Sequence, residues 1–248
     1  MKLAKAKKPA AKPTKRPAVM TGAAIPVLRW PPDEDRVEAI FERLSGVMPE
    51  PKTELDFSNP FTLVVAVALS AQATDVSVNK ATERLFKVAD TPEKMLALGE
   101  EGLVPYIASI GLYRGKARNV IALSRIVLEQ HGGEVPLNRA DLQALPGVGR
   151  KTASVVLNEL GIEAAIAVDT HVFRVSHRLG LANAGTPDKV EAQLFKVVPE
   201  DWLPKAHHWL ILHGRYTCTA RKPKCLSCII ADLCPSRAGL MALGETAG

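Results

Sequence analysis

The chain has 248 residues, enough for one large domain or two small ones with a substantial core. Hydrophobic residues make up 47% of it and charged residues 23%, and no apolar run approaches the roughly 18 residues that a membrane helix needs, so the composition excludes a membrane-spanning protein. Aromatic residues make up only 5%, which excludes a nucleic-acid binder that works chiefly by stacking bases on rows of rings.

The positive charge lies almost entirely in the first 30 residues. They hold eight of the 32 Lys and Arg and none of the 26 Asp and Glu, so the rest of the chain carries a net charge of −2. A segment such as KKPAAKPTKRP cannot bury apolar area, and residues 1–30 are predicted to be a disordered basic arm. The arm is either a solubilising extension, a non-specific contact to a polyanion, or a targeting signal.

From Glu34 onward the pattern predicts one helix after another and no strands, so the expected fold class is all-α. Capping residues mark several starts: Asn59-Pro60 opens an apolar stretch over 61–69, Asp75 is expected to cap a helix through Leu85, and Thr91-Pro92 opens the next. The remaining predicted helices cover 116–131, a short stretch from Asn138 to Leu145, 151–160, 170–179, 189–197 and 206–213.

Residues 145–153, Leu-Pro-Gly-Val-Gly-Arg-Lys-Thr-Ala, join two of these helices through a glycine turn. Gly147 and Gly149 allow a tight turn and close approach of the backbone to another surface, and the free N–H groups of the next helix can bind a phosphate. An ordinary turn between helices is the alternative. Lys151 lies where the helix N-terminus and Arg150 disfavour the ammonium form, which suits a role for the free amine, or else it is a phosphate-binding lysine.

Asp169 precedes the apolar-periodic segment 170–179 and is a good helix N-cap. A carboxylate fixed in this way also suits the stabilisation of a positive charge that develops during a reaction. From the sequence, the two roles are compatible.

All four cysteines lie within 17 residues, with the spacing Cys218-x6-Cys225-x2-Cys228-x5-Cys234. Such a group converges on one metal centre, and the residues alone leave Zn²⁺ and an iron–sulfur cluster both open. Because the cysteines are clustered and no signal peptide precedes them, we expect an intracellular, cytoplasmic protein.

Four motifs in order resemble the helix-hairpin-helix DNA glycosylase superfamily and, within it, the endonuclease III family, over about residues 31–234. They are the segment Leu69–Asp75 (LSAQATD), the hairpin LPGVGRKTA, the segment Val168–Arg174 (VDTHVFR) and the cysteine spacing. One departure is Ser154, where the family usually has Asn, which puts fine substrate preference in doubt.

The resemblance implies a bifunctional enzyme of base excision repair, a DNA glycosylase for oxidised pyrimidines with abasic-site lyase activity. It implies Lys151 as the nucleophile that forms a Schiff base, Asp169 as the catalytic aspartate, and one [4Fe–4S] cluster on Cys218, Cys225, Cys228 and Cys234. The implied partner is double-stranded DNA with damaged pyrimidines or abasic sites, bound by a monomer.

The resemblance also implies further site residues. Gln72, Ile110 and Leu112 match residues that enter the duplex, although the two aliphatic ones are equally readable as core residues. Asp75 and His171 match residues of the substrate pocket. Residues expected to contact the DNA backbone, on a basic face around 147–151 and 215–224, are Gly147, Gly149, Arg150, Arg221, Lys222 and Lys224.

Two helical domains are implied: a six-helix domain over 53–165 that holds the hairpin, and a cluster domain made of 31–52 with 166–240. Two alternatives remain at this point. A non-catalytic hairpin module for DNA binding would leave Lys151 and Asp169 unexplained, and the adenine-specific glycosylases, which share the cluster, usually lack the lysine.

Overall fold

The computed structural model describes residues 29–245, which form helices joined by turns, with no strand among them. This confirms the all-α fold class for the described part of the chain. Residues 1–28, which make up nearly all of the predicted basic arm, lie outside it. Within 29–245, no helix has both the length and the apolar character to cross a membrane.

The α-helices of the described chain are, in order, α1 (Glu34–Val47), α2 (Pro60–Ser70), α3 (Asp75–Leu85), α4 (Pro92–Ile107), α5 (Tyr113–His131), α6 (Arg139–Ala144), α7 (Arg150–Glu159), α8 (Thr170–Arg178), α9 (Pro187–Val197), α10 (Leu203–Tyr216) and α11 (Arg237–Glu245). Two short 3₁₀ turns, η1 (Glu200–Trp202) and η2 (Cys225–Ser227), complete the list.

Side-chain caps begin most of these helices where the sequence predicts a start. The Asn59 carboxamide oxygen accepts a hydrogen bond from the Thr62 N–H at 2.8 Å, and Pro60 occupies the first helical position of α2. Thr91 caps α4 and Asn138 caps α6 in the same way. The expected cap of α3 is wrong by one residue, because Thr74 accepts the bond from the Ser77 N–H and Asp75 is already helical.

Three helices differ most from the sequence-based expectation. Helix α5 begins at Tyr113, after Leu112 in the left-handed conformation, rather than at Lys116. Helix α10 extends three residues further at each end than the apolar pattern 206–213. The sequence predicts no helix at α11, because residues 237–245 have no capping residue and no clear pattern of apolar positions.

Two separate clusters of buried apolar side chains form the core. One draws on α2 to α7 and includes Leu63, Leu123 and Val156, all fully buried. The other joins α1 to α8, α9 and α10 and includes Phe41 and Val172. We call the first group of helices the hairpin half and the second, with α11, the cysteine half.

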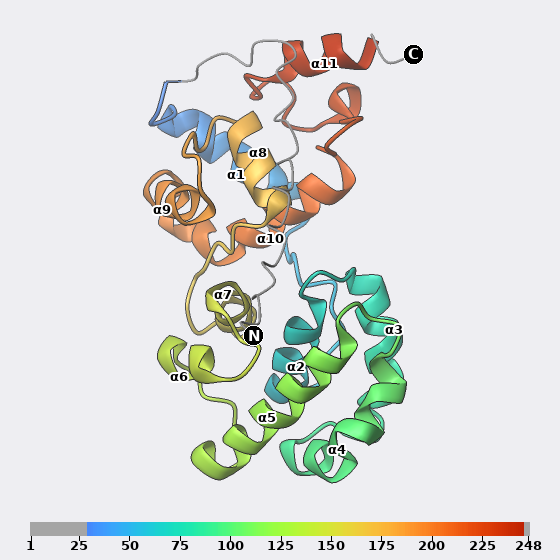
Figure 1. Ribbon diagram of the computed structural model, residues 1–248. Helices are drawn as coiled ribbons and strands as arrows, with labels where there is room; N and C mark the ends of the chain where they lie inside the picture. Colours follow the sequence, from blue (N-terminus) through green and yellow to red (C-terminus); the bar gives the residue numbers. More distant parts are fainter. Residues whose placement is uncertain (1–28, 246–248) are drawn as a thin grey trace, which may run out of the picture.

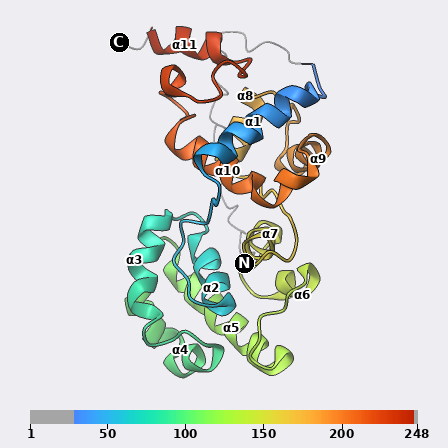
Figure 2. The same ribbon diagram turned by 180° about the vertical axis from the view of Figure 1, so that it is seen from behind.

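The two halves are stacked end to end, and both views show this arrangement (Figures 1 and 2). Helix α7 lies at the edge of the hairpin half nearest the cysteine half, and α10 lies at the facing edge of the cysteine half. The chain crosses between the halves twice, once between α1 and α2 and once between α7 and α8.

Candidate active site and cysteine loop

The glycine turn between α6 and α7 uses its two glycines for different reasons. Gly147 has φ +81°, and a Cβ there would lie 3.0 Å from the Asn119 Cβ, so both its conformation and its neighbour require glycine. A Cβ on Gly149 would meet nothing within 4 Å. Since the protein itself does not need a glycine at 149, the open space there is available to another molecule.

The N-terminus of α7 has no side-chain cap, because Gly149 is its N-cap residue. The first N–H groups of a helix have no partner within the helix, so this end of α7 can accept an anion such as a phosphate. Lys151 lies in the same first turn with an exposed side chain. The turn therefore combines free backbone donors with a primary amine.

Lys151 also lies close enough to α10 to affect it. The pKa of His207 is lowered to about 3, mainly by burial and also by the positive charges of His208, Lys151 and Arg215. The His207 ring is 4% exposed, and its Nδ1 is buried without a partner. The charge at the start of α7 thus acts on a residue of the cysteine half, the half that carries Asp169.

Arg150, the neighbour of Lys151, is paired with acids rather than free. Its guanidinium lies 2.8 Å from a Glu191 carboxylate oxygen and 3.5 Å from Asp188, both in α9. Arg215 is paired too, as described below. The basic face expected around 147–151 and 215–224 is therefore partly neutralised, and its free cations lie mainly in the cysteine loop.

Asp169 is the N-cap of α8, as the sequence indicates. Its Oδ1 accepts hydrogen bonds from the backbone N–H groups of His171 at 2.8 Å and Val172 at 2.7 Å. Two short bonds from a helix N-terminus hold the carboxylate in one place. Both of these hydrogen bonds go to Oδ1, which leaves Oδ2 able to interact with another group.

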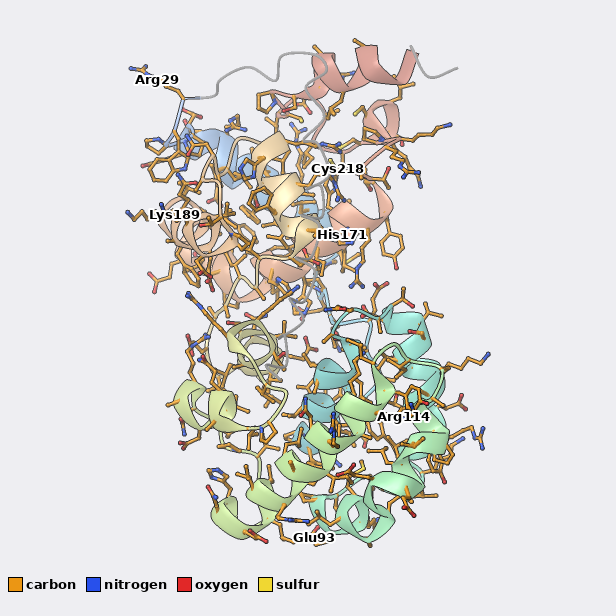
Figure 3. The ribbon with its side chains drawn as sticks, viewed as in Figure 1. Arg29, Glu93, Arg114, His171, Lys189 and Cys218 are labelled. Atoms are coloured by element: carbon orange, nitrogen blue, oxygen red, sulfur yellow. The ribbon has the colours of Figure 1, made fainter. Side chains whose placement is uncertain are left out.

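His171 lies on the side of the cysteine half that faces the hairpin half (Figure 3). Its position depends on close packing between α8 and α10, where a Cβ on Gly214 would lie 3.0 Å from both the His171 Cβ and a Val175 methyl group. Arg174 supports the same contact, since its guanidinium donates to the Gly214 carbonyl at 2.8 Å and to the Cys218 carbonyl at 3.1 Å. The pocket residue expected at 171 is thus fixed by its own helix pair.

Asp75 occupies the start of α3 and is bound across the junction between the halves. Arg215 of α10 donates to Asp75 at 2.5 Å and also to Glu54, which Tyr216 contacts through its hydroxyl. Although burial alone would raise the pKa of Glu54, hydrogen bonds from Tyr216 and Arg215 lower it. Glu54, Arg215 and Tyr216 carry no sequence signal that marks them as partners of Asp75.

Gln72 and Leu112 are the two non-glycine residues of the described chain with positive φ, at 56° and 61°. Both side chains are exposed, Leu112 to 68%. A non-glycine residue in the left-handed region costs energy, and such residues are concentrated at functional sites. Of the three positions that the family resemblance predicts to enter the duplex, these two have the left-handed conformation.

Ile110 is a correction to that prediction. Its side chain is 2% exposed and belongs to the core of the hairpin half. An aliphatic side chain that already fills the protein core cannot also fill a gap in the DNA stack without unpacking. Of the two readings that the sequence left for Ile110, the core reading holds.

Ser154 also lies in the interior, at 2% exposure. Its hydroxyl accepts a hydrogen bond from the Arg139 guanidinium at 2.8 Å, and Arg139 is paired with Glu163 at 2.7 Å. The residue thus serves to join α6 to α7 one turn after Lys151. Its departure from the usual Asn affects the support of α7 rather than an exposed surface.

The four cysteines line one small cavity in the cysteine half, together with His213 and Arg237, and none of them forms a disulfide. Burial raises the pKa of the Cys234 thiol to about 11 and also raises the pKa of Cys225 and Cys228. Four thiolates this close need a positively charged centre to be stable together. The residues present therefore fit a metal cluster held by four thiolates.

Three cations lie between the first two cysteines. The side chains of Arg221, Lys222 and Lys224 are exposed, and the loop that bears them is closed by a hydrogen bond from the Lys224 N–H to the Thr217 carbonyl at 2.9 Å. Since none of the three has an ion-pair partner among the described residues, their charges are available to an external anion.

Comparison with known proteins agrees with these features. Residues 65–200 match the family described as "HhH-GPD superfamily base excision DNA repair protein", and residues 218–234 match "Iron-sulfur binding domain of endonuclease III". Endonuclease III of Escherichia coli (strain K12) is 61% identical over 195 residues, covering 79% of this chain and 92% of the relative. Endonuclease III of Rickettsia conorii is 58% identical over 198 residues, covering 80% and 94%.

A solved structure titled "Structure of a Trapped Endonuclease III-DNA Covalent Intermediate: Estranged-Adenine Complex" has a TM-score of 0.78 at 43% identity, covering 84% of this chain and 99% of that one. These matches confirm the fold, the iron–sulfur centre and the enzyme class that the motifs predict, a base excision repair glycosylase with abasic-site lyase activity. The chain belongs to the endonuclease III family of the HhH-GPD superfamily.

Proposed function

We propose that the protein removes oxidised pyrimidines from duplex DNA and cleaves the strand at the resulting abasic site, with Lys151 as the nucleophile and Asp169 as the catalytic carboxylate. The observation that carries the proposal is the uncapped N-terminus of α7, which places Lys151 beside free backbone donors and near enough to α10 for its charge to act on His207. Asp169 is held in that half by two backbone donors.

The reaction begins with a damaged nucleotide turned out of the duplex, at a cost of a few kcal/mol that is smaller where the lesion weakens stacking or pairing. As the bond from C1′ to the base breaks, the base leaves with the bonding electrons and C1′ becomes positive. The Asp169 carboxylate stabilises that charge, and the Lys151 Nζ lone pair forms the new bond to C1′.

Strand cleavage follows from the imine. The bond from C1′ to the ring oxygen opens, which leaves a protonated Schiff base between C1′ and Nζ. The imine makes a proton on C2′ acidic, and its removal sends an electron pair toward C3′, where the 3′ phosphate leaves. Hydrolysis of the imine returns the free amine of Lys151.

Several exposed groups support a duplex as the ligand. Gln72 and Leu112 would fill the gap left by the flipped nucleotide, since they protrude in the left-handed conformation. The α7 N-terminus and the cations of the cysteine loop would bind backbone phosphates, and each such contact adds to the salt dependence of binding. His171 would line the pocket for the base, with Asp75 beside it in its pair with Arg215.

We further propose that Cys218, Cys225, Cys228 and Cys234 hold a [4Fe–4S] cluster, which neutralises the thiolates and cross-links the loop that carries Arg221, Lys222 and Lys224. No step of the reaction passes through it. The two apolar cores support the domain division 53–165 and 31–52 with 166–240. The unpaired cysteines support an intracellular, cytoplasmic location, and we propose a monomer.

Borohydride reduction tests the function directly. Wild-type protein mixed with abasic-site duplex and borohydride should form a covalent adduct, and Lys151→Ala should form none while still binding a duplex with a tetrahydrofuran abasic analogue. Lys87→Ala, which removes an exposed lysine of the hairpin half, is the matched control and should react like the wild type.

A panel of duplexes then tests the lesion class. Cleavage should be faster for oxidised pyrimidines, such as thymine glycol, than for oxidised purines or for adenine in a mispair. Tight duplex binding by the wild type without any adduct would instead identify a non-catalytic hairpin module, and preferential removal of adenine would overturn the assigned substrate class.

A further inference from the structure

The two halves of the molecule do not share a core. Each apolar cluster is confined to its own half, and polar contacts between side chains join the two halves instead. These are Arg150 with Glu191 and Asp188, Glu159 with His208, and Arg215 with Glu54 and Asp75. Because Lys151 and Asp169 lie in different halves, polar bridges rather than apolar packing set their relative position.

Helix α7 is tied to the cysteine half at both of its ends. Arg150 at its first position contacts α9, and Glu159 at its last position contacts α10. The connection from α7 to α8 leaves directly after Glu159, so that pair lies beside one of the two places where the chain crosses between halves (Figure 1). A linker without regular secondary structure permits rotation of one half against the other, and the pair restricts that rotation.

The Glu159–His208 pair is the buried one among these bridges. The His208 Nε2 and the Glu159 Oε2 are 2.9 Å apart, and the two side chains are only 8% and 9% exposed. By contrast, the Arg150 side chain is 56% exposed. Water screens an exposed pair, so such a pair contributes little free energy. A buried, hydrogen-bonded pair has a defined geometry, and removing one partner costs much more free energy.

The length of α7 turns a small change at Glu159 into a large one at Lys151. The eight helical steps from Lys151 to Glu159 span about 12 Å, so a tilt of about 5° about the Glu159 end moves the start of the helix by about 1 Å. A displacement of that size at a reacting group can cost about a hundredfold in rate.

We propose that Glu159 and His208 are positioning residues that hold Lys151 at the distance and angle its attack requires. The proposal rests on the proposed function of Lys151. Neither residue touches substrate, and both act through the orientation of α7. His207 supports the same arrangement, since its ring lies edge-on to His208 with 5.2 Å between centroids and its pKa responds to the Lys151 charge.

The test compares three variants with the wild type. Glu159→Ala removes the acceptor, Glu159→Gln keeps a carboxamide oxygen that can accept from His208, and Met95→Ala opens a cavity in the hairpin half away from the junction. For each we would measure the thermal midpoint, the affinity for duplex with the tetrahydrofuran analogue, and the single-turnover rate of adduct formation under borohydride, well below every midpoint.

Glu159→Ala should form the adduct at least tenfold more slowly while its duplex affinity stays within about threefold of the wild type. Glu159→Gln should recover most of the rate, and Met95→Ala should keep it despite a lower midpoint. Should Glu159→Ala fail to fold, Glu159→Leu takes its place, since it removes the acceptor and fills the space.

A Glu159→Ala rate within threefold of the wild type would overturn the proposal, as would an equal loss in Met95→Ala, which would attribute the effect to stability. Failure of the proposed function looks different. In that case the wild type itself gives no adduct, and the comparison among variants does not arise.

Discussion

Asp169 caps α8 and, in the proposed function, also stabilises a positive charge at C1′, and one pair of substitutions can separate these two roles. Its carboxylate caps α8 through the N–H groups of His171 and Val172, at 2.8 and 2.7 Å. Asn retains the acceptor oxygen and is as good an N-cap as Asp, so Asp169→Asn should change the free energy of unfolding by less than about 0.5 kcal/mol. Asp169→Ala loses the cap and should destabilise by about 1 kcal/mol.

The effect on the reaction should follow a different order. Both substitutions remove the negative charge that stabilises C1′ in the proposed reaction. Loss of one preorganised electrostatic group raises a barrier by about 3 kcal/mol, or about a hundredfold or more in rate. We therefore expect the Asn and Ala variants to lose base excision about equally while they differ in stability.

Urea unfolding and single-turnover excision from a lesion-containing duplex measure the two quantities on the same preparations. An Asn variant that retains excision within about threefold would show that Asp169 is only a cap. A rate that falls in proportion to stability, larger for Ala than for Asn, would also refute the electrostatic role.

Other substitutions test the packing, the duplex contact and the pH dependence. Gly214→Ala places a Cβ 3.0 Å from the His171 Cβ and should lower the unfolding free energy by about 1–3 kcal/mol in urea, whereas no loss would mean that α8 shifts freely. Leu112→Ala should change the unfolding free energy by less than about 0.5 kcal/mol but slow base excision. Ile110→Ala should lower the unfolding free energy by about 2–5 kcal/mol, because its side chain is buried. Equal losses of stability in the two variants would contradict this difference in burial. Burial lowers the pKa of His207 from 6.5 to about 3, so between these values the unfolded chain binds a proton that the folded protein does not. Stability should therefore fall as the pH drops from 7 to 5, and His207→Asn should flatten that slope in urea titrations, while an unchanged slope would assign it to other groups.

Local signals predict most of the fold. Asn59-Pro60, Thr91-Pro92 and Asn138 each begin a helix because a side-chain oxygen satisfies a free N–H, and that contact lies within four residues. The predicted start of α5 is wrong because no local signal marks the true one. Leu112 adopts a left-handed conformation that no local rule assigns to leucine, and the helix starts there.

The site is predictable only where its residues carry a motif. Neighbouring residues in the chain identify Lys151, Asp169, the four cysteines and Leu112 as candidates. They do not predict that Ile110 is buried while Leu112 is exposed. Which of these two aliphatic residues points into the core depends on the conformation of the turn between α4 and α5, which tertiary packing imposes.

Partners far apart in the chain escape sequence analysis altogether. Arg215 meets Asp75 and Glu54, and His208 meets Glu159, across about 50 to 160 positions of sequence. Their side chains look like ordinary surface charges until the two halves are brought together. The two acids on α9 that neutralise Arg150 are also distant from it in sequence. Because of them, the basic face is smaller than the sequence analysis predicts.

The cysteine half is built from two stretches of chain, and this has a consequence for biosynthesis. Helix α1 offers Val37, Ile40 and Phe41 to a core whose other members begin only at Ile166. At a synthesis rate of about 5–20 residues per second, the apolar face of α1 stays exposed for on the order of ten seconds before the rest of this core is synthesised. The hairpin half is continuous and can complete its fold meanwhile. Helix α1 is therefore synthesised before the hairpin half but buried after it. During this interval its exposed apolar face is a binding site for a chaperone on the nascent chain.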